Sequence, residues 1–155
     1  MIRQRLGKDL LFFDGGMGTL LQEKGLAPGE LPETWNLTHS EEIYKIHRQY
    51  IEAGSDIILT NTFGANALKF HDDSCSLEEI IKAAVSHVKK AEREALLQTG
   101  DERKIYTALD VGPTGKLLKP MGDLEFETAY EAFKEVVILG EQAGADLIHI
   151  ETMSD

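Results

Sequence analysis

Apolar runs that end at polar residues recur four times along the chain. The runs and their polar ends read LLFFD (10–14), DIILTN (56–61), KIYTALD (104–110) and LIHIE (147–151). Short apolar runs of this kind, bounded by glycine, favour strands that are buried on both faces, as in a parallel sheet. We therefore predict four strands, each with polar side chains at its carboxyl end.

Segments with helical periodicity separate these runs. The spacing of apolar residues predicts helices over about 39–53, 77–97 and 123–143. Thr38–Glu41 and Ser76–Glu79 have the spacing of capping boxes, which mark helix starts. The expected buried side of the third helix consists of Phe126, Tyr130, Phe133, Val136 and Val137.

Strands that alternate with helices require a parallel sheet with right-handed crossovers. The segments EAGSDIIL and QAGADLIHI pass from helix to strand in the same way, which indicates two equivalent units. The candidate folds are a (β/α)₈ barrel and a doubly wound sheet, and both bind ligands at the carboxyl ends of their strands. The residues predicted at those ends are Asp14, Thr60, Asn61, Asp110 and Glu151.

Composition and charge narrow the class of protein. The 155 residues fit one domain, and 42% hydrophobic residues can bury a sizeable core. No apolar stretch approaches the roughly 18 residues of a membrane span, and the single Cys75 cannot form an internal disulfide, so we expect a cytoplasmic protein. A net charge of -11, with no cluster of Lys and Arg, argues against nucleic-acid binding.

The glycine-rich turn after the first run is the most informative candidate site. Gly15, Gly16 and Gly18 have no Cβ and allow positive φ, so backbone N–H groups there can approach a ligand. The turn does not match G-x-G-x-x-G, and Asp14 would repel a phosphate. A zwitterion fits better, with its ammonium on Asp14 or Glu151 and its carboxylate on the amides. The alternative is a simple turn with a solvated Asp14.

Other chemically active side chains are interpreted as structural. His47 and His149 lie within apolar segments, where a hydrogen-bonded or packed core histidine is expected rather than a ligand. Trp35 is expected to pack under its loop. The set His71, Asp72 and Cys75 matches no compact zinc motif, so we expect a loop there.

Several motifs then carry a family resemblance. DGGMGT (14–19), the long segment LPETWN to TFGAN (31–66), DVGPTG (110–115) and GADLIHIETMSD (144–155) resemble the homocysteine S-methyltransferase domain at the N-terminus of cobalamin-dependent methionine synthase. The resemblance implies a (β/α)₈ barrel that binds homocysteine, with zinc activating the thiol as methyl acceptor. It also implies that the methyl group comes from methylcobalamin, which methyltetrahydrofolate recharges.

The resemblance also assigns roles to residues. It implies that Asp14 and Glu151 hold the substrate ammonium and that the backbone from Gly15 to Gly18 holds the carboxylate, with Asn61, Thr62 and Asp110 as neighbours. The predicted substrate site comprises Asp14, Gly15, Gly16, Met17, Gly18, Thr19, Asn61, Thr62, Asp110 and Glu151.

The cysteines that bind zinc in the resembled family lie late in the barrel, and none of those positions occurs here. We therefore expect residues 1–155 to form one partial domain, the first half of a barrel with about four βα units, without metal ligands. Its open edges would pair with the missing half or with another copy. Such a chain would not catalyse methyl transfer alone. Alternatives are a non-catalytic, self-associating half-barrel and part of a betaine- or S-methylmethionine-dependent enzyme.

Overall fold

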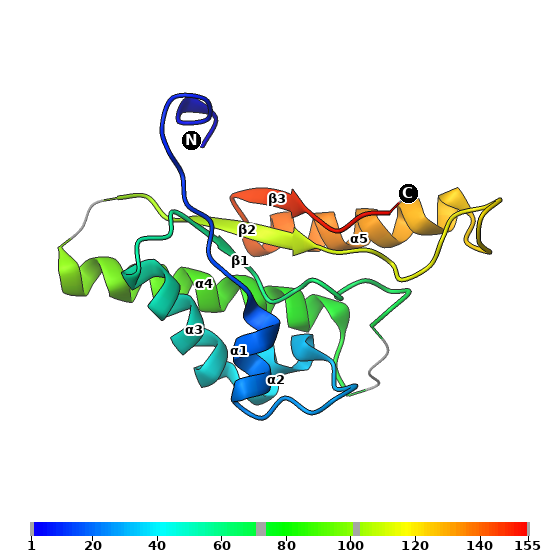
Figure 1. Ribbon diagram of the computed structural model, residues 1–155, viewed down its shortest axis with the longest axis horizontal. Coiled ribbons are helices and arrows are strands. Elements are labelled where there is room, and N and C mark those ends of the chain that lie inside the picture. Colours follow the sequence, from blue (N-terminus) through cyan, green and yellow to red (C-terminus); the bar gives the residue numbers. More distant parts are fainter. Residues whose placement is uncertain (1, 71–73, 101–102, 155) are drawn as a thin grey trace.

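A computed structural model describes residues 2–70, 74–100 and 103–154 of the chain (Figure 1). Its sheet contains three parallel strands in the order β1-β2-β3. The strands are β1 (Ile57–Leu59), β2 (Tyr106–Val111) and β3 (Leu147–Ile150). The α/β class with a parallel sheet is therefore confirmed. His71 and Asp72 lie outside the described residues.

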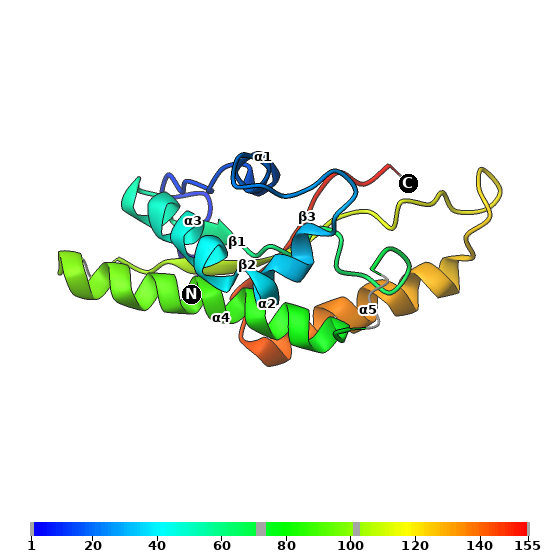
Figure 2. The same ribbon diagram turned by 90° about the horizontal axis from the view of Figure 1, so that it is seen from below.

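The predicted helices are present with small shifts at their ends. The α-helices are α1 (Met17–Glu23), α2 (Trp35–Thr38), α3 (Ser40–Glu52), α4 (Leu77–Thr99) and α5 (Phe126–Ala143). Short 3₁₀ segments, η1 and η2, cover Ile2–Gln4 and Pro32–Thr34. Helices α4 and α5 lie along one face of the sheet, and α3 lies beside α4 (Figure 2). None of the described helices has the length and apolar character of a membrane span.

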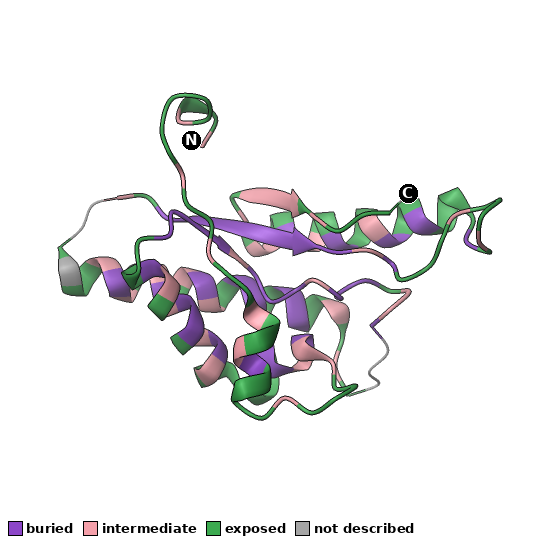
Figure 3. Ribbon diagram, viewed as in Figure 1, coloured by how far each residue is buried: buried purple, intermediate pink, exposed green. Residues whose placement is uncertain are grey.

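The central strand β2 is buried at all six positions (Figure 3). Strands pair with it on both sides, and α4 and α5 pack against one of its faces. Leu109 and Val111 of β2 meet Ile80, Ile81 and Val136 of these helices in one apolar cluster. Burial of this apolar surface, worth roughly 25 cal/mol per Å², fixes the sheet on its helices.

The first apolar run does not form a buried strand, which corrects the prediction of four strands. Phe13 makes a single parallel bridge to Ile57, and the backbone of Phe12 accepts bonds from Asp56 and Ile57. Leu10 and Phe12 remain 76% and 55% exposed. The run pairs with β1 on one side, and of its described apolar side chains only Leu11 packs against the core cluster of β1 and β2. Its composition is that of a buried strand, but burial depends on neighbours.

The predicted buried side of helix α5 is confirmed only in part. Val136 is buried and Phe133 packs against the core as predicted, whereas Phe126, Tyr130 and Val137 are exposed. The other buried positions are the small residues Ala129, Ala132 and Gly140. Small residues let the helix lie close to β2, since a Cβ on Gly140 would come within 2.3 Å of a methyl group of Leu109. The helix carries apolar residues on two sides, and periodicity alone selected the bulkier side.

One of the two predicted capping boxes forms. Ser76 Oγ accepts from the backbone N–H of Glu79, whose carboxylate accepts from the N–H of Ser76 at 2.8 Å. The box predicted at Thr38 is wrong, because the Thr38 hydroxyl donates to the carbonyl of Thr34, the residue before α2, and His39 precedes α3.

Two predicted core residues are buried as expected. Trp35 is 3% exposed, and its indole N–H donates to Glu30 at 2.7 Å. His47 is fully buried, but neither ring nitrogen has a hydrogen-bond partner among the described residues, contrary to the expected bond. Burial and the nearby His87 lower the pKa of His47 to about 3, so its imidazole is neutral.

Candidate functional site

The carboxyl ends of the strands open into a cleft of about 460 Å³. Most of the residues predicted for the site line it together. The lining residues are Asp14, Gly15, Gly16, Met17, Gly18, Pro32, Glu33, Leu59, Thr60, Asn61, Phe63, Asp110 and Glu151. Two predicted residues, Thr19 and Thr62, are not among them.

Thr62 does not line the cleft but bonds to the backbone of Asp110, which does. Its hydroxyl donates to the backbone carbonyl of Asp110 at 2.7 Å and lies 2.7 Å from the Thr60 hydroxyl. Thr60 Oγ1 in turn accepts from the backbone N–H of Asp110 at 3.1 Å. The two threonines therefore continue the pairing of β1 with β2 beyond the end of β1. Thr19 is exposed on α1.

Asp14 and Asp110 each bring a buried carboxylate oxygen to the cleft. Asp14 Oδ2 accepts from the backbone N–H of Leu59 at 3.1 Å, whereas its Oδ1 has no hydrogen-bond partner among the described residues. The Oδ1 atom of Asp110 is buried and also lacks a partner there. Asp14 is hydrogen-bonded and half-buried, so it is not the solvated aspartate of the simple-turn alternative.

Burial is the largest influence on the pKa values of Asp14 and Asp110. It raises the pKa of Asp14 to about 7 against the effect of the Leu59 hydrogen bond, and the charge of Glu151 adds to the rise. Burial also raises the pKa of Asp110 to about 7, with further contributions from Glu151, Asp14 and Glu33. A bound cation would favour the ionised form of both groups and would offset part of the cost of their burial.

Helix α3 holds the backbone from Gly15 to Gly18, which is called the glycine segment below. The Tyr50 hydroxyl donates to the backbone carbonyl of Gly16 at 3.2 Å, and a Cβ on Gly15 would lie 2.8 Å from that hydroxyl oxygen. Gly15, Gly16 and Gly18 all have negative φ, so the left-handed conformation allowed in the prediction is not used. At Gly15, close approach to Tyr50 explains the absence of a side chain.

Sequence reasoning missed Glu33 as part of the cleft. Its side chain is 3% exposed, and its carboxylate accepts from the backbone N–H of Gly64 at 2.6 Å. A Cβ on Gly64 would lie 2.8 Å from that carboxylate, so glycine permits the contact. Glu33 lies in the short segment η2, which has no apolar periodicity, and the only available signal was its place in the LPETWN motif.

Asn61 is hydrogen-bonded to residues of η2 and α2, close to Glu33 in the sequence. Its side-chain amide donates to the carbonyl of Pro32 at 2.8 Å, and Asn36 Nδ2 donates to the carbonyl of Asn61 at 2.8 Å. Asn36 was also missed, although it is 1% exposed. These bonds fix the polar end of β1 against η2 and α2, so Asn61 has a structural function beside its place in the cleft wall.

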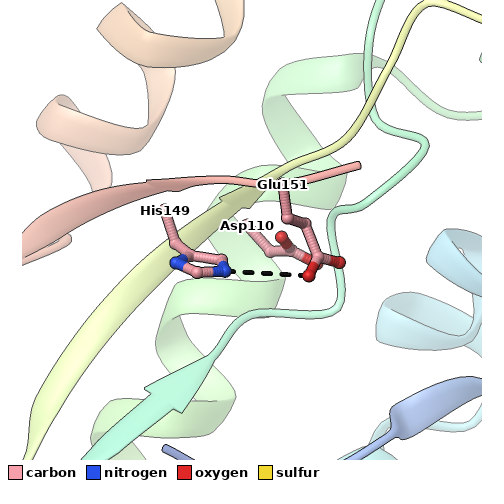
Figure 4. Close-up of side chains that lie close together, drawn as sticks. All are labelled: Asp110, His149 and Glu151. Carbon is pink, nitrogen blue, oxygen red and sulfur yellow. Dashed lines mark ion pairs between the residues drawn. The ribbon is translucent and has the colours of Figure 1, made fainter. Parts of the chain in front are cut away.

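His149 is half-buried beside the cleft, where its ring packs 5.0 Å from the ring of Phe13. Its Nε2 lies 3.7 Å from Glu151 Oε2, and Asp110 completes the group (Figure 4). The thiolate zinc site that the resemblance implies does not fit this chain. Cys75, the sole cysteine, packs against the core just before α4 and does not line the cleft.

The fold defines half of a (β/α)₈ barrel, with a cleft at the carboxyl edge of its sheet. Crystal structures of the homocysteine methyltransferase MmuM from Escherichia coli have the same fold. The metallated form matches 98% of this chain and 57% of its own with a TM-score of 0.82 at 23% identity. The apo form matches 96% and 51% with a TM-score of 0.72 at 25% identity.

The sequence family agrees with the fold. Residues 11–155 match the homocysteine S-methyltransferase family model, and the chain belongs to this family. It is also 30% identical over 158 aligned positions to methionine synthase from Mycobacterium leprae. That alignment covers 98% of this chain but 13% of the relative, and the chain spans about half the length of the solved structures.

Replacing Asp110 with Asn should make the chain more stable at alkaline pH. A group whose pKa is raised by folding contributes stability that is complete below about pH 4 and is lost as the pH rises to about 7. At about pH 8 we expect Asp110→Asn to raise the free energy of unfolding by about 1 to 2 kcal/mol, with little gain near pH 4. Urea unfolding at both pH values measures the change.

The exposed Asp123 provides the matched control, since Asp123→Asn removes the same charge outside the cleft. A gain at alkaline pH that is equal in the two variants would contradict the role of burial at Asp110.

Proposed function

We propose that this chain is the homocysteine-binding part of a homocysteine S-methyltransferase of the methionine synthase type. The observation that carries the proposal is the meeting of Asp14, Asp110 and Glu151 with the glycine segment in one cleft, within a chain of this family. The identity to a methionine synthase supports the choice of parent enzyme.

Homocysteine is a zwitterion with a thiol on a short carbon chain, and the cleft offers a complement to each part. Asp14 and Glu151 hold the ammonium, with Asp110 beside them. Four carboxyl groups and no Lys or Arg are among its described lining residues, which favours a cationic group. The backbone from Gly15 to Gly18 holds the carboxylate, because the first N–H groups of α1 have no partner within the helix.

Methyl transfer requires the thiol of homocysteine to react as a thiolate. In the proposed complete domain, zinc bound by thiolates lowers the pKa of that thiol. The ligands would come from residues that this chain does not contain. We propose methylcobalamin, recharged by methyltetrahydrofolate on other modules, as the methyl source. The residues described here bind and orient the amino-acid end of the substrate.

Neutral variants of the two ammonium-binding residues should weaken homocysteine binding. Asp14→Asn and Glu151→Gln each remove a charged hydrogen bond, so we expect losses of about 1 to 3 kcal/mol in binding free energy. Calorimetric titration with reduced homocysteine in the presence of EDTA measures these losses. Glu141→Gln, an exposed charge on α5, is the control. Unchanged affinity in both cleft variants would reject the assigned roles.

The purified chain should not form methionine by itself. With zinc, homocysteine and methylcobalamin supplied together, we expect no methyl transfer above the rate without protein, since the chain lacks a thiolate site for zinc. Methionine formation is followed by mass spectrometry. Turnover by the 155-residue chain, abolished by Glu151→Gln, would disprove this expectation.

A second candidate function is self-association as a half-barrel. Within the described residues β3 pairs with β2 alone, and its Ile150 is 65% exposed. Apolar side chains are also exposed near the other edge of the sheet, at Leu10 and Phe12. Unpaired edges with apolar side chains favour pairing with a second copy or with the remainder of a barrel.

Sedimentation equilibrium tests this second candidate. We expect a mass above that of the monomer, which Ile150→Lys at the edge of the sheet should lower. Leu97→Lys places the same charge on a leucine of α4 that is 78% exposed and should leave the mass unchanged. A monomer at all concentrations would count against self-association.

A further inference from the structure

Three side chains with metal-binding atoms converge at the carboxyl ends of β2 and β3. Asp110 and His149 are paired residues of the two neighbouring strands. Glu151 follows His149 by two positions, so both side chains point to the same face of the sheet. Figure 4 shows the imidazole and the two carboxylates turned toward one another.

The distances between these groups suit a small cation after minor rotation of the side chains. One imidazole nitrogen and one oxygen from each carboxylate lie within 4.8 Å of one another. Bonds of about 2.1 Å place two ligands of one ion at most about 4.2 Å apart, so closure requires a movement of about half an ångström. A set of one imidazole and two carboxylates suits first-row divalent ions and leaves further positions for water.

An independent observation points to a missing partner at this place. Asp110 is 6% exposed, and its Oδ1 atom is buried without a hydrogen-bond partner among the described residues. A buried carboxylate oxygen without a partner is costly, and a bound cation removes that cost. Asp14 and Glu33 add negative charge to the same cleft.

We propose that Asp110, His149 and Glu151 bind a divalent first-row cation such as Mn²⁺. The site uses no cysteine and differs from the thiolate zinc site that the resemblance implies. Glu151 is common to this site and to the proposed ammonium site, so cation and homocysteine compete for it. The competition rests on the proposed function, whereas binding of the cation does not.

Titration of the metal-free chain with Mn²⁺ alone, followed by electron paramagnetic resonance at slightly alkaline pH, tests the site. Mn²⁺ prefers oxygen and nitrogen ligands, so the sulfur of Cys75 competes little for it. We expect one saturable site, and Asp110→Asn and His149→Gln should each weaken it about tenfold or more. His149 is half-buried, so its variant should also remain folded and provides a second measurement of the site.

The matched control is Glu135→Gln, which removes an exposed charge from α5 outside the cleft. It should leave Mn²⁺ affinity unchanged. The absence of a saturable site, or equal weakening by Glu135→Gln and His149→Gln, would overturn the proposal in favour of diffuse attraction to an acidic surface.

Homocysteine titrations with EDTA and with saturating Mn²⁺ separate the two proposals. We expect Mn²⁺ to weaken homocysteine binding in the unaltered chain and not in His149→Gln. If homocysteine fails to bind in EDTA while Mn²⁺ still binds, the proposed function is rejected and the cation site is supported. If homocysteine binds and Mn²⁺ does not, the cation site falls alone.

Discussion

The parallel, in-register pairing of β2 with β1 and β3 is the constraint on which the rest of the molecule depends. It aligns Leu59 with Ala108 and Asp110 with His149, so polar residues at the strand ends emerge at one edge. A shift of one residue would turn every side chain of a strand to the opposite face. The apolar contacts of β2 with α4 and α5 therefore determine where Asp110 lies, although those contacts are on the other side of the strand.

In the cleft, hydrogen bonds fix the backbone at the strand ends, while the carboxyl groups there have no Lys or Arg beside them among the described lining residues. Thr60 and Thr62 tie the strand ends together through backbone bonds to Asp110, and Asn36 and Pro32 hold Asn61. The carboxyl groups that this scaffold presents receive few hydrogen bonds of their own. Because these acceptors are already fixed, the proposed binding of a cationic ligand would cost little conformational entropy.

The strands, the helices and the shared edge could be predicted from the sequence because each depends on local pattern. A run such as Ile57 to Leu59, followed by Thr60 and Asn61, carries both its burial and its polar end in adjacent residues. Glu33 could not be found in this way, since its function in the cleft comes from a contact with Gly64 thirty-one positions later.

The predictions from sequence that were wrong concern contacts between segments that lie far apart in the chain. Leu10 and Phe12 have the composition of a buried strand, yet their exposure is decided by which segments lie beside them. Helix α5 buries Val136 as its periodicity indicates, but close packing against Leu109 also brings small residues such as Gly140 to the core in place of Phe126 and Tyr130. His47 is buried as its position in the pattern indicates, but pattern does not show whether a partner faces its ring.

The contact of Tyr50 with the glycine segment links helix α3 to the cleft. Tyr50 belongs to α3, whose core residues pack on α4 and β1, and its hydroxyl reaches the segment that is proposed to hold the ligand carboxylate. A ligand that orders this segment therefore also stabilises the docking of α3. By the same linkage, loosening α3 from the core would lower ligand affinity without altering any atom in the cleft.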